Sequence, residues 1–140
     1  MKGRRKTFHD SLTGVCIDVL YGEPDFCSRF LRKLGVDDDL KGLAGCCFNL
    51  RHEQEGVRRF VVWIRPEKDR ISLAGTVAHE VLHLALGLQR IMNDADHVDV
   101  ISSTNEETIV YHFEGLFENI WQWILKVSDS TGSEDPKLES

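Results

Sequence analysis

The sequence lacks an excess of positive charge. Its formal net charge is −6 at pH 7, which excludes the basic balance typical of proteins that bind nucleic acid non-specifically. The one basic run is short and lies at the N-terminus, where it comprises Lys2, Arg4, Arg5 and Lys6. We interpret this run as a solvated terminus and expect no nucleic-acid partner.

The cysteines lack the spacing of a zinc knuckle or of an evident disulfide framework. The sequence has four of them, Cys16, Cys27, Cys46 and Cys47, with no Cys-x-x-Cys pair among them. We therefore interpret all four as free thiols in a reducing compartment.

Long uninterrupted apolar runs are also lacking. No apolar segment follows the basic start, so the pattern does not indicate a signal peptide. The most apolar stretch, residues 75–88 (GTVAHEVLHLALGL), is interrupted by polar side chains and is short for a bilayer span. We therefore expect a soluble cytoplasmic protein with no membrane partner, located in the host cytoplasm if a phage encodes it.

What the sequence does contain is a mixed order of predicted elements. A chain of 140 residues fits one domain, and we expect it to span residues 1–127, followed by a disordered acidic tail over residues 128–140. The predicted elements, in chain order, are a strand or short buried helix at 15–21, a helix at 24–35, strands at 43–50 and 57–65, and helices at 73–92 and 104–127. This order favours an α+β fold over a doubly wound sheet.

The helix predicted over residues 73–92 carries a metal-binding pattern. His79 and His83 are four residues apart, so they lie one turn above each other and can share one metal ion. Glu80 is turned by about 100° from His79, which places it beside the metal rather than on it. Two imidazole ligands and a carboxylate base form the helical metalloprotease arrangement, with zinc as the metal. The alternative is a core helix whose histidines are satisfied by backbone partners.

A catalytic zinc usually has a third protein ligand. The residues at positions 86 and 89 are Leu and Gln, which excludes the metzincin pattern. The helix predicted over residues 104–127 has an apolar stripe through Ile109, Val110, Phe113, Leu116, Phe117, Ile120 and Ile124. Glu106 lies one turn before Val110, inside that stripe, so we favour it as the third ligand. Glu107 fits a capping box with Thr104.

Several alternatives stay open around the metal. Glu107, His97 and Asp96 are further possible ligands, and Glu106 can instead complete a capping box that starts at Ser103. Tyr111, His112 and His97 are each able to stabilise a developing oxyanion. His112 points largely away from the apolar stripe, and we interpret Tyr111 as a surface aromatic.

The Asn-Glu pair at 105–106, after the His-Glu-x-x-His helix, resembles the start of the third-ligand helix in the gluzincin metallopeptidases. The run from FVVWI through TVAHEVLHLALGL to NEETIVYHFEGLF is similar to small uncharacterised zincin-like proteins of bacteriophages, and it covers about half of the chain, residues 60–127. This resemblance implies a minimal zincin-like domain: a short sheet packed on the active-site helix, and a second long C-terminal helix. It implies His79, His83 and Glu106 as ligands and Glu80 as catalytic acid/base, and it implies no known substrate.

We therefore expect a zinc metallopeptidase with one Zn²⁺ per chain and a peptide or protein substrate. The strand at 57–65 precedes the active-site helix, so it is expected to form a rim of the cleft, with a free edge that can pair with an extended peptide. The alternative for that strand is an ordinary place within the sheet. The alternative function is a non-catalytic, metal-stabilised binding protein, such as a phage or bacterial effector or regulator.

Overall fold

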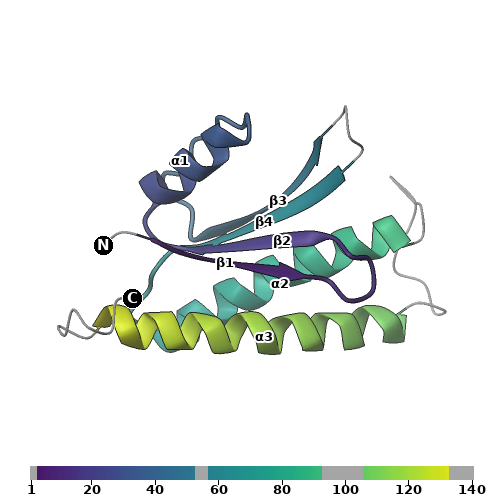
Figure 1. Cartoon of the computed structure of the whole chain (residues 1–140). Helices are drawn as coiled ribbons and strands as arrows, with labels where there is room; N and C mark the ends of the chain where they lie inside the picture. The colour runs from purple at the N-terminus through teal and green to yellow at the C-terminus, as the bar shows by residue number, and fades with distance from the viewer. Residues whose placement is uncertain (1–2, 53–56, 93–105, 133–140) are drawn as a thin grey trace.

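A computed structural model describes residues 3–52, 57–92 and 106–132 (Figure 1). The elements, in chain order, are β1 (Arg4–His9), β2 (Cys16–Tyr21), α1 (Pro24–Lys33), β3 (Gly45–His52), β4 (Val57–Ile64), α2 (Arg70–Met92) and α3 (Glu106–Gly132). The predicted α+β fold is confirmed, with a short sheet, the His-Glu-x-x-His pattern on a long helix and a second long helix at the C-terminal end.

The four strands form one mixed sheet in the order β1-β2-β4-β3. The two outer strands run antiparallel to their neighbours, whereas β2 and β4 in the middle run parallel. A parallel pair needs a long connection, and here that connection contains α1 and β3. The sheet therefore has β1 and β3 as its edges.

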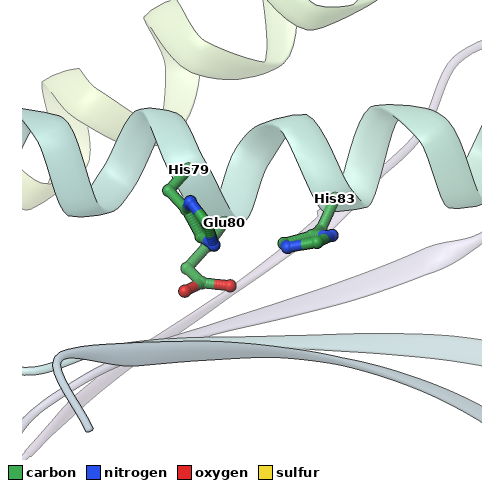
Figure 2. A group of neighbouring side chains, drawn as sticks. All are labelled: His79, Glu80 and His83. Atoms are coloured by element: carbon green, nitrogen blue, oxygen red, sulfur yellow. The ribbon is translucent and has the colours of Figure 1, made fainter.

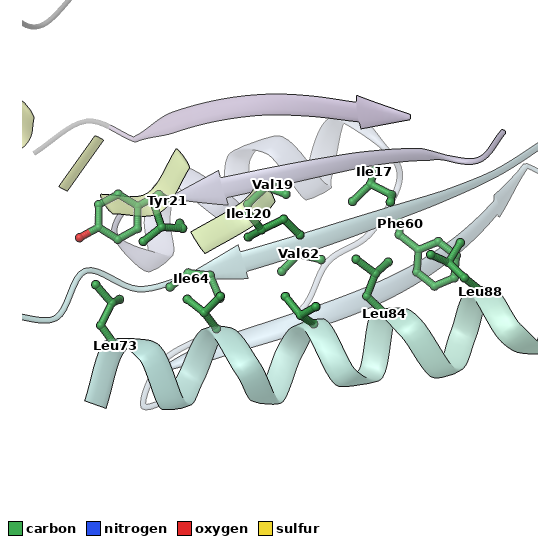
Figure 3. Close-up of a cluster of buried hydrophobic side chains, with 13 residues drawn as sticks. Ile17, Val19, Tyr21, Phe60, Val62, Ile64, Leu73, Leu84, Leu88 and Ile120 are labelled. Atoms are coloured by element: carbon green, nitrogen blue, oxygen red, sulfur yellow. The ribbon is translucent and has the colours of Figure 1, made fainter. Parts of the chain in front are cut away.

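Strand β4 is buried on both faces of the sheet. Phe60, Val62 and Ile64 face the layer of α2 and α3, while Val61 and Trp63 face α1. Successive strand residues point to opposite faces, so an uninterrupted apolar run fits a strand that is covered on both sides. Figure 1 shows α1 on one face of the sheet and the two long helices on the other, and Figure 3 shows the core between the sheet and α2.

Helix α2 packs one apolar side against the sheet. Leu73, Val77, Val81, Leu84 and Leu88, three or four residues apart, are fully or almost fully buried. This helix has 23 residues and contains an 18-residue window with a mean hydropathy of 1.4, so by length and composition alone it is able to cross a membrane. The expectation that the apolar stretch is too short and too polar for a span is therefore wrong. Packing in the core accounts for these apolar side chains equally well, and the cytoplasmic location stays a prediction.

Three residues of the basic N-terminal run, Arg4, Arg5 and Lys6, lie in a strand and not in a free terminus, while Lys2 lies outside the described residues. Residues 4–9 form β1, which pairs with β2 from Arg4 opposite Tyr21 to His9 opposite Cys16. Arg5 and Lys6 are exposed on this edge strand, where charged side chains discourage pairing with other chains. The prediction failed because the pairing depends on a partner strand that residues 4–9 do not themselves reveal.

Helix α3 runs five residues further than predicted, to Gly132. The first part of the expected tail, residues 128–132, is therefore helical, and residues 133–140 lie outside the described residues. Arg70 and Asp129 form an exposed ion pair of 2.5 Å between the start of α2 and the end of α3. An exposed pair contributes at most about 1 kcal/mol, but its position shows that the two helices run antiparallel.

The buried side of α3 differs from the predicted stripe. Ile109, Ile120 and Ile124 are buried as expected, but Val110 is 51% exposed and His112 is only 8% exposed. The expectation that His112 points away from the core is therefore wrong. The buried side passes through position 112 because a partner from another element satisfies the imidazole there.

That partner is Asp10, which follows β1. His112 Nε2 donates a hydrogen bond of 2.6 Å to Asp10 Oδ1, and both side chains are buried. Asp10 Oδ2 accepts two further hydrogen bonds from Thr13, one of 2.9 Å from its backbone N–H and one of 2.6 Å from its hydroxyl group. Burial alone raises the pKa of Asp10, but these hydrogen bonds and the imidazole outweigh it and lower the pKa. The pair thus ties the β1–β2 connection to α3.

We predict that Asp10 contributes to acid sensitivity. Because its pKa is lower in the folded chain than the ordinary value of 3.8, the unfolded chain takes up the proton first. The stabilisation is complete above that ordinary value and is lost as the pH falls through the folded-state pKa. Urea unfolding at about pH 7 and about pH 3 should therefore show a smaller loss of stability in Asp10→Asn than in the wild type. Equal losses in the two proteins would contradict this role.

Candidate metal centre

The middle of α2 brings His79, Glu80 and His83 together. One ligand atom from each residue lies within 4.8 Å of the other two. The two imidazole rings have centroids 4.8 Å apart and planes inclined by 74°. Figure 2 shows both imidazoles beside each other along the helix and the Glu80 carboxylate extending toward the sheet. The predicted clustering of these three residues is confirmed.

The three side chains differ in their exposure. The histidines are exposed, whereas Glu80 is only 7% exposed. Burial raises the pKa of Glu80, and the imidazoles of His79 and His83 partly offset that effect. A carboxylate with a raised pKa holds a proton more strongly than an ordinary one, which suits it to act as a base.

A glycine allows β3 to approach α2 closely at this point. A Cβ atom at Gly45 would lie 2.8 Å from the carbonyl oxygen of Trp63, 3.0 Å from Cγ2 of Thr76 and 3.2 Å from Cγ of Glu80. Any larger residue would have to displace the neighbouring strand or the helix. Sequence reasoning missed this role, although a glycine in a strand often marks such a close approach.

The strand beside Glu80 is β3, not the one predicted. The expectation that residues 57–65 provide a free edge at the cleft is wrong, because β4 pairs with β2 on one side and with β3 on the other. Among the described strands, β3 has one unpaired edge. Gly45 lies at the beginning of this strand, directly over Glu80.

The structure does not bring Glu106 into the group. Glu106 is exposed as the first residue of α3, and Val110, which placed it in the apolar stripe, is exposed as well. Because the helices are antiparallel, the first turn of α3 lies at the same end of the helical layer as the C-terminal end of α2 (Figure 1). Met92 is nine residues beyond His83, which corresponds to about 14 Å along a helix.

The other predicted site residues lie elsewhere. Glu107 is exposed in the first turn of α3, and Tyr111 is 69% exposed, which confirms it as a surface aromatic. His112 is held by Asp10. The remaining alternatives, His97 and Asp96, lie outside the described residues, as do the capping residues Ser103 and Thr104.

No cysteine thiolate competes as a ligand within the described group. Cys47 packs against the core on the side of α2. Burial raises its pKa to about 12, and the nearby Glu80 carboxylate adds to that effect. Without a bound metal, this thiol is therefore protonated at neutral pH.

The donor set fits a divalent metal with an open coordination position. Imidazole nitrogens suit zinc, copper, iron and nickel, and two exposed imidazoles one helical turn apart leave room for water on the solvent side. No protein family, curated protein or solved structure matches this chain.

We predict that His79 and His83 hold about one zinc ion per chain. Elemental analysis after purification and dialysis should find zinc in the wild type and almost none in the double variant His79→Ala, His83→Ala, because that variant lacks both imidazoles. Wild-type metal content in the double variant would place the metal elsewhere.

Glu106→Ala tests the disagreement between the sequence resemblance and the structure. Because Glu106 lies outside the group, its replacement should leave the zinc affinity unchanged in titrations against a competing chelator. A severe loss of affinity would instead restore Glu106 as the third ligand. Glu114→Ala, which removes another exposed carboxylate from α3, is the matched control.

Proposed function

We propose that this protein is a zinc-dependent hydrolase that cleaves peptide bonds. The observation that supports the proposal best is the buried Glu80 carboxylate within 4.8 Å of two exposed imidazoles. A metal site that served only to stabilise the fold would not need an acid/base group next to its ligands. The proposal also agrees with the resemblance of the motif to the gluzincin metallopeptidases.

Each of the three side chains has a definite role in this proposal. Zinc, when bound, acts as a Lewis acid that polarises the scissile carbonyl and lowers the pKa of water. His79 and His83 hold the ion through their ring nitrogens on the solvent side of α2. Glu80 accepts the proton of the attacking water and later delivers it to the leaving amine. Its low exposure keeps bulk water away from the carboxylate.

The unpaired edge of β3 supports a peptide as the substrate. An extended chain can add to such an edge through main-chain hydrogen bonds. A peptide bound there would pass beside Glu80, since the strand begins at Gly45 over that residue. The peptide or protein substrate thus stays part of the proposal, with recognition through β3 in place of β4.

The third protein ligand is the incomplete part of this centre. Among the described residues, no further histidine, cysteine or carboxylate joins His79, Glu80 and His83. This observation favours the second candidate function, a metal-stabilised binding protein without catalytic activity. The two functions differ in their dependence on Glu80, because a binding protein has no proton to transfer.

We predict that Glu80→Gln abolishes turnover and leaves zinc binding intact. Glutamine keeps the shape of the side chain but cannot accept the proton, and such transfers contribute about 10²–10⁴-fold to the rate. The measurement is the appearance of new protein termini in a host lysate treated with zinc-loaded protein. Zinc content and the melting temperature, measured on the same preparations, show that the variant is folded and loaded.

Glu114→Gln is the control for the amide substitution itself, because Glu114 is exposed on α3. Termini that appear with the wild type and Glu114→Gln but not with Glu80→Gln support the hydrolase. Termini that appear equally with all three proteins come from a contaminant. If no terminus depends on Glu80, the binding-protein function replaces the proposal.

A further inference from the structure

Helices α2 and α3 have one side that faces away from the sheet, and no described element covers it (Figure 1). Large apolar side chains are nevertheless accessible on these helices: Leu82 is 46% exposed and Val110 is 51% exposed. Phe117 and Trp121 are half-buried, and their rings stack with centroids 6.1 Å apart. We call this side of the two helices the outer face. Apolar side chains grouped on one face mark a contact with another molecule.

The outer face is large enough for a protein interface. Helix α2 has 23 residues, which corresponds to a length of about 34 Å. Two helices packed side by side are together about 20 Å wide. The outer face therefore offers about 700 Å² per molecule, close to the roughly 800 Å² that each partner buries in a stable complex.

The two helices carry different polar groups beside these apolar residues. Helix α3 has the exposed carboxylates of Glu107 and Glu118, whereas α2 has the exposed imidazoles of His79 and His83 and the exposed guanidinium group of Arg90. A second copy whose α2 lies over α3 of the first would bring complementary groups together. Placing α3 over α3 would instead bring carboxylates together, which opposes association. The complementary arrangement results from a twofold axis parallel to the helices.

Positions along the helices agree with this arrangement. The ion pair between Arg70 and Asp129 fixes which residues of the two antiparallel helices lie at the same level. Glu118 lies 11 residues before Asp129, while His79 and His83 lie 9 and 13 residues after Arg70. Glu118 is therefore level with the midpoint between the two histidines. Rotation about an axis parallel to the helices keeps each residue at its level, so Glu118 of the second copy faces the metal-binding pair.

Two further pairs match when they are counted from the same ion pair. Leu82 and Phe117 are each 12 residues away from it, so apolar side chains of the two copies meet. Arg90 and Glu107 are 20 and 22 residues away, a difference of about 3 Å along a helix. The guanidinium group of one copy thus lies opposite the carboxylate of the other.

We propose that two copies of this chain pair through their outer faces, and that Glu118 of each copy is the third ligand of the metal centre of the other. The ligand role rests on the proposed zinc site. It supplies a carboxylate that no described residue of the same chain adds to His79, Glu80 and His83, and zinc accepts a carboxylate beside two imidazoles. Strand β3 is not part of the outer face, so its edge stays accessible to a peptide.

Charge reversal at Arg90 and Glu107 tests the pairing. Light scattering of the full chain should give twice the mass of one chain at about 50 μM, above the micromolar to picomolar dissociation constants of such interfaces. Arg90→Glu and Glu107→Arg should each weaken association at least about 10-fold, because like charges then face each other. The double variant restores opposite charges and should regain the affinity. A monomeric wild type, or a double variant as weak as the single variants, would overturn the dimer.

Mixing two variants tests the ligand role of Glu118. One variant, His79→Ala with His83→Ala, lacks both imidazoles, and the other, Glu118→Ala, lacks the carboxylate. Each alone should bind zinc at least about 10-fold more weakly than the wild type. A 1:1 mixture should recover tight binding in about a quarter of the centres, because about half of the dimers are mixed and each of these has one complete centre.

Glu106→Ala is the control for the mixing experiment, because it removes an exposed carboxylate of α3 at another level and should bind zinc like the wild type. No recovery on mixing, or wild-type affinity in Glu118→Ala alone, would overturn the ligand role. Absence of zinc binding by the wild type would overturn the proposed hydrolase together with that role. The dimer is decided separately, since its mass is measured with metal-free protein as well.

Discussion

The burial of β4 on both faces is the constraint on which the rest of the fold depends. Its apolar residues must be covered from two sides, so α1 packs on one face and the pair α2 and α3 packs on the other. A strand in this position also needs hydrogen-bonding partners along both edges, which β2 and β3 provide. Because β3 is then the last strand beside α2, one of the two edges of the sheet lies next to His79, Glu80 and His83.

The packing of α2 fixes where its polar side chains lie. Val77, Val81 and Leu84 face the sheet and are fully buried. A rotation of the helix would expose them to water, at a free-energy cost of about 25 cal/mol for each Å² of apolar surface. With this rotation fixed, His79 and His83 face solvent, while Glu80 lies at the boundary between helix and strand. The missing side chain at Gly45 provides the space for that carboxylate. The geometry of this group thus depends on apolar contacts made by other residues of α2.

Local sequence patterns predicted most of the helices and strands. They predicted less well which of these elements pair or pack with each other. Hydrophobic periodicity within a segment identified α1, β3, β4 and the two long helices. It did not identify β1, whose charged residues are stabilised by pairing with β2, or show that β4 is central, which depends on its parallel pairing with β2. The predicted buried side of α3 was wrong at His112 for a similar reason. His112 is buried because Asp10, far away in the sequence, bonds to it.

In the candidate centre, too, the features that depend on local sequence were predicted, and those that depend on contacts between distant elements were not. Helical spacing is a local property, so the clustering of His79, Glu80 and His83 followed from the sequence. The third ligand depends on how two helices are placed, and there the prediction of Glu106 and the structure disagree. Which strand lies beside Glu80 likewise depends on the order of the strands in the sheet.

The stability cost at Glu80 is a further reason to assign it a function. Burial raises its pKa above the ordinary value of 4.5, so the folded chain holds this proton to higher pH than the unfolded chain does. As the pH rises above that value, the charged form destabilises the folded state, and the cost is complete above the folded-state pKa. A buried carboxylate that lowers stability at neutral pH contributes nothing to folding that an apolar residue would not. Natural proteins retain such costs where activity requires them, and the residues next to Glu80 are the two imidazoles.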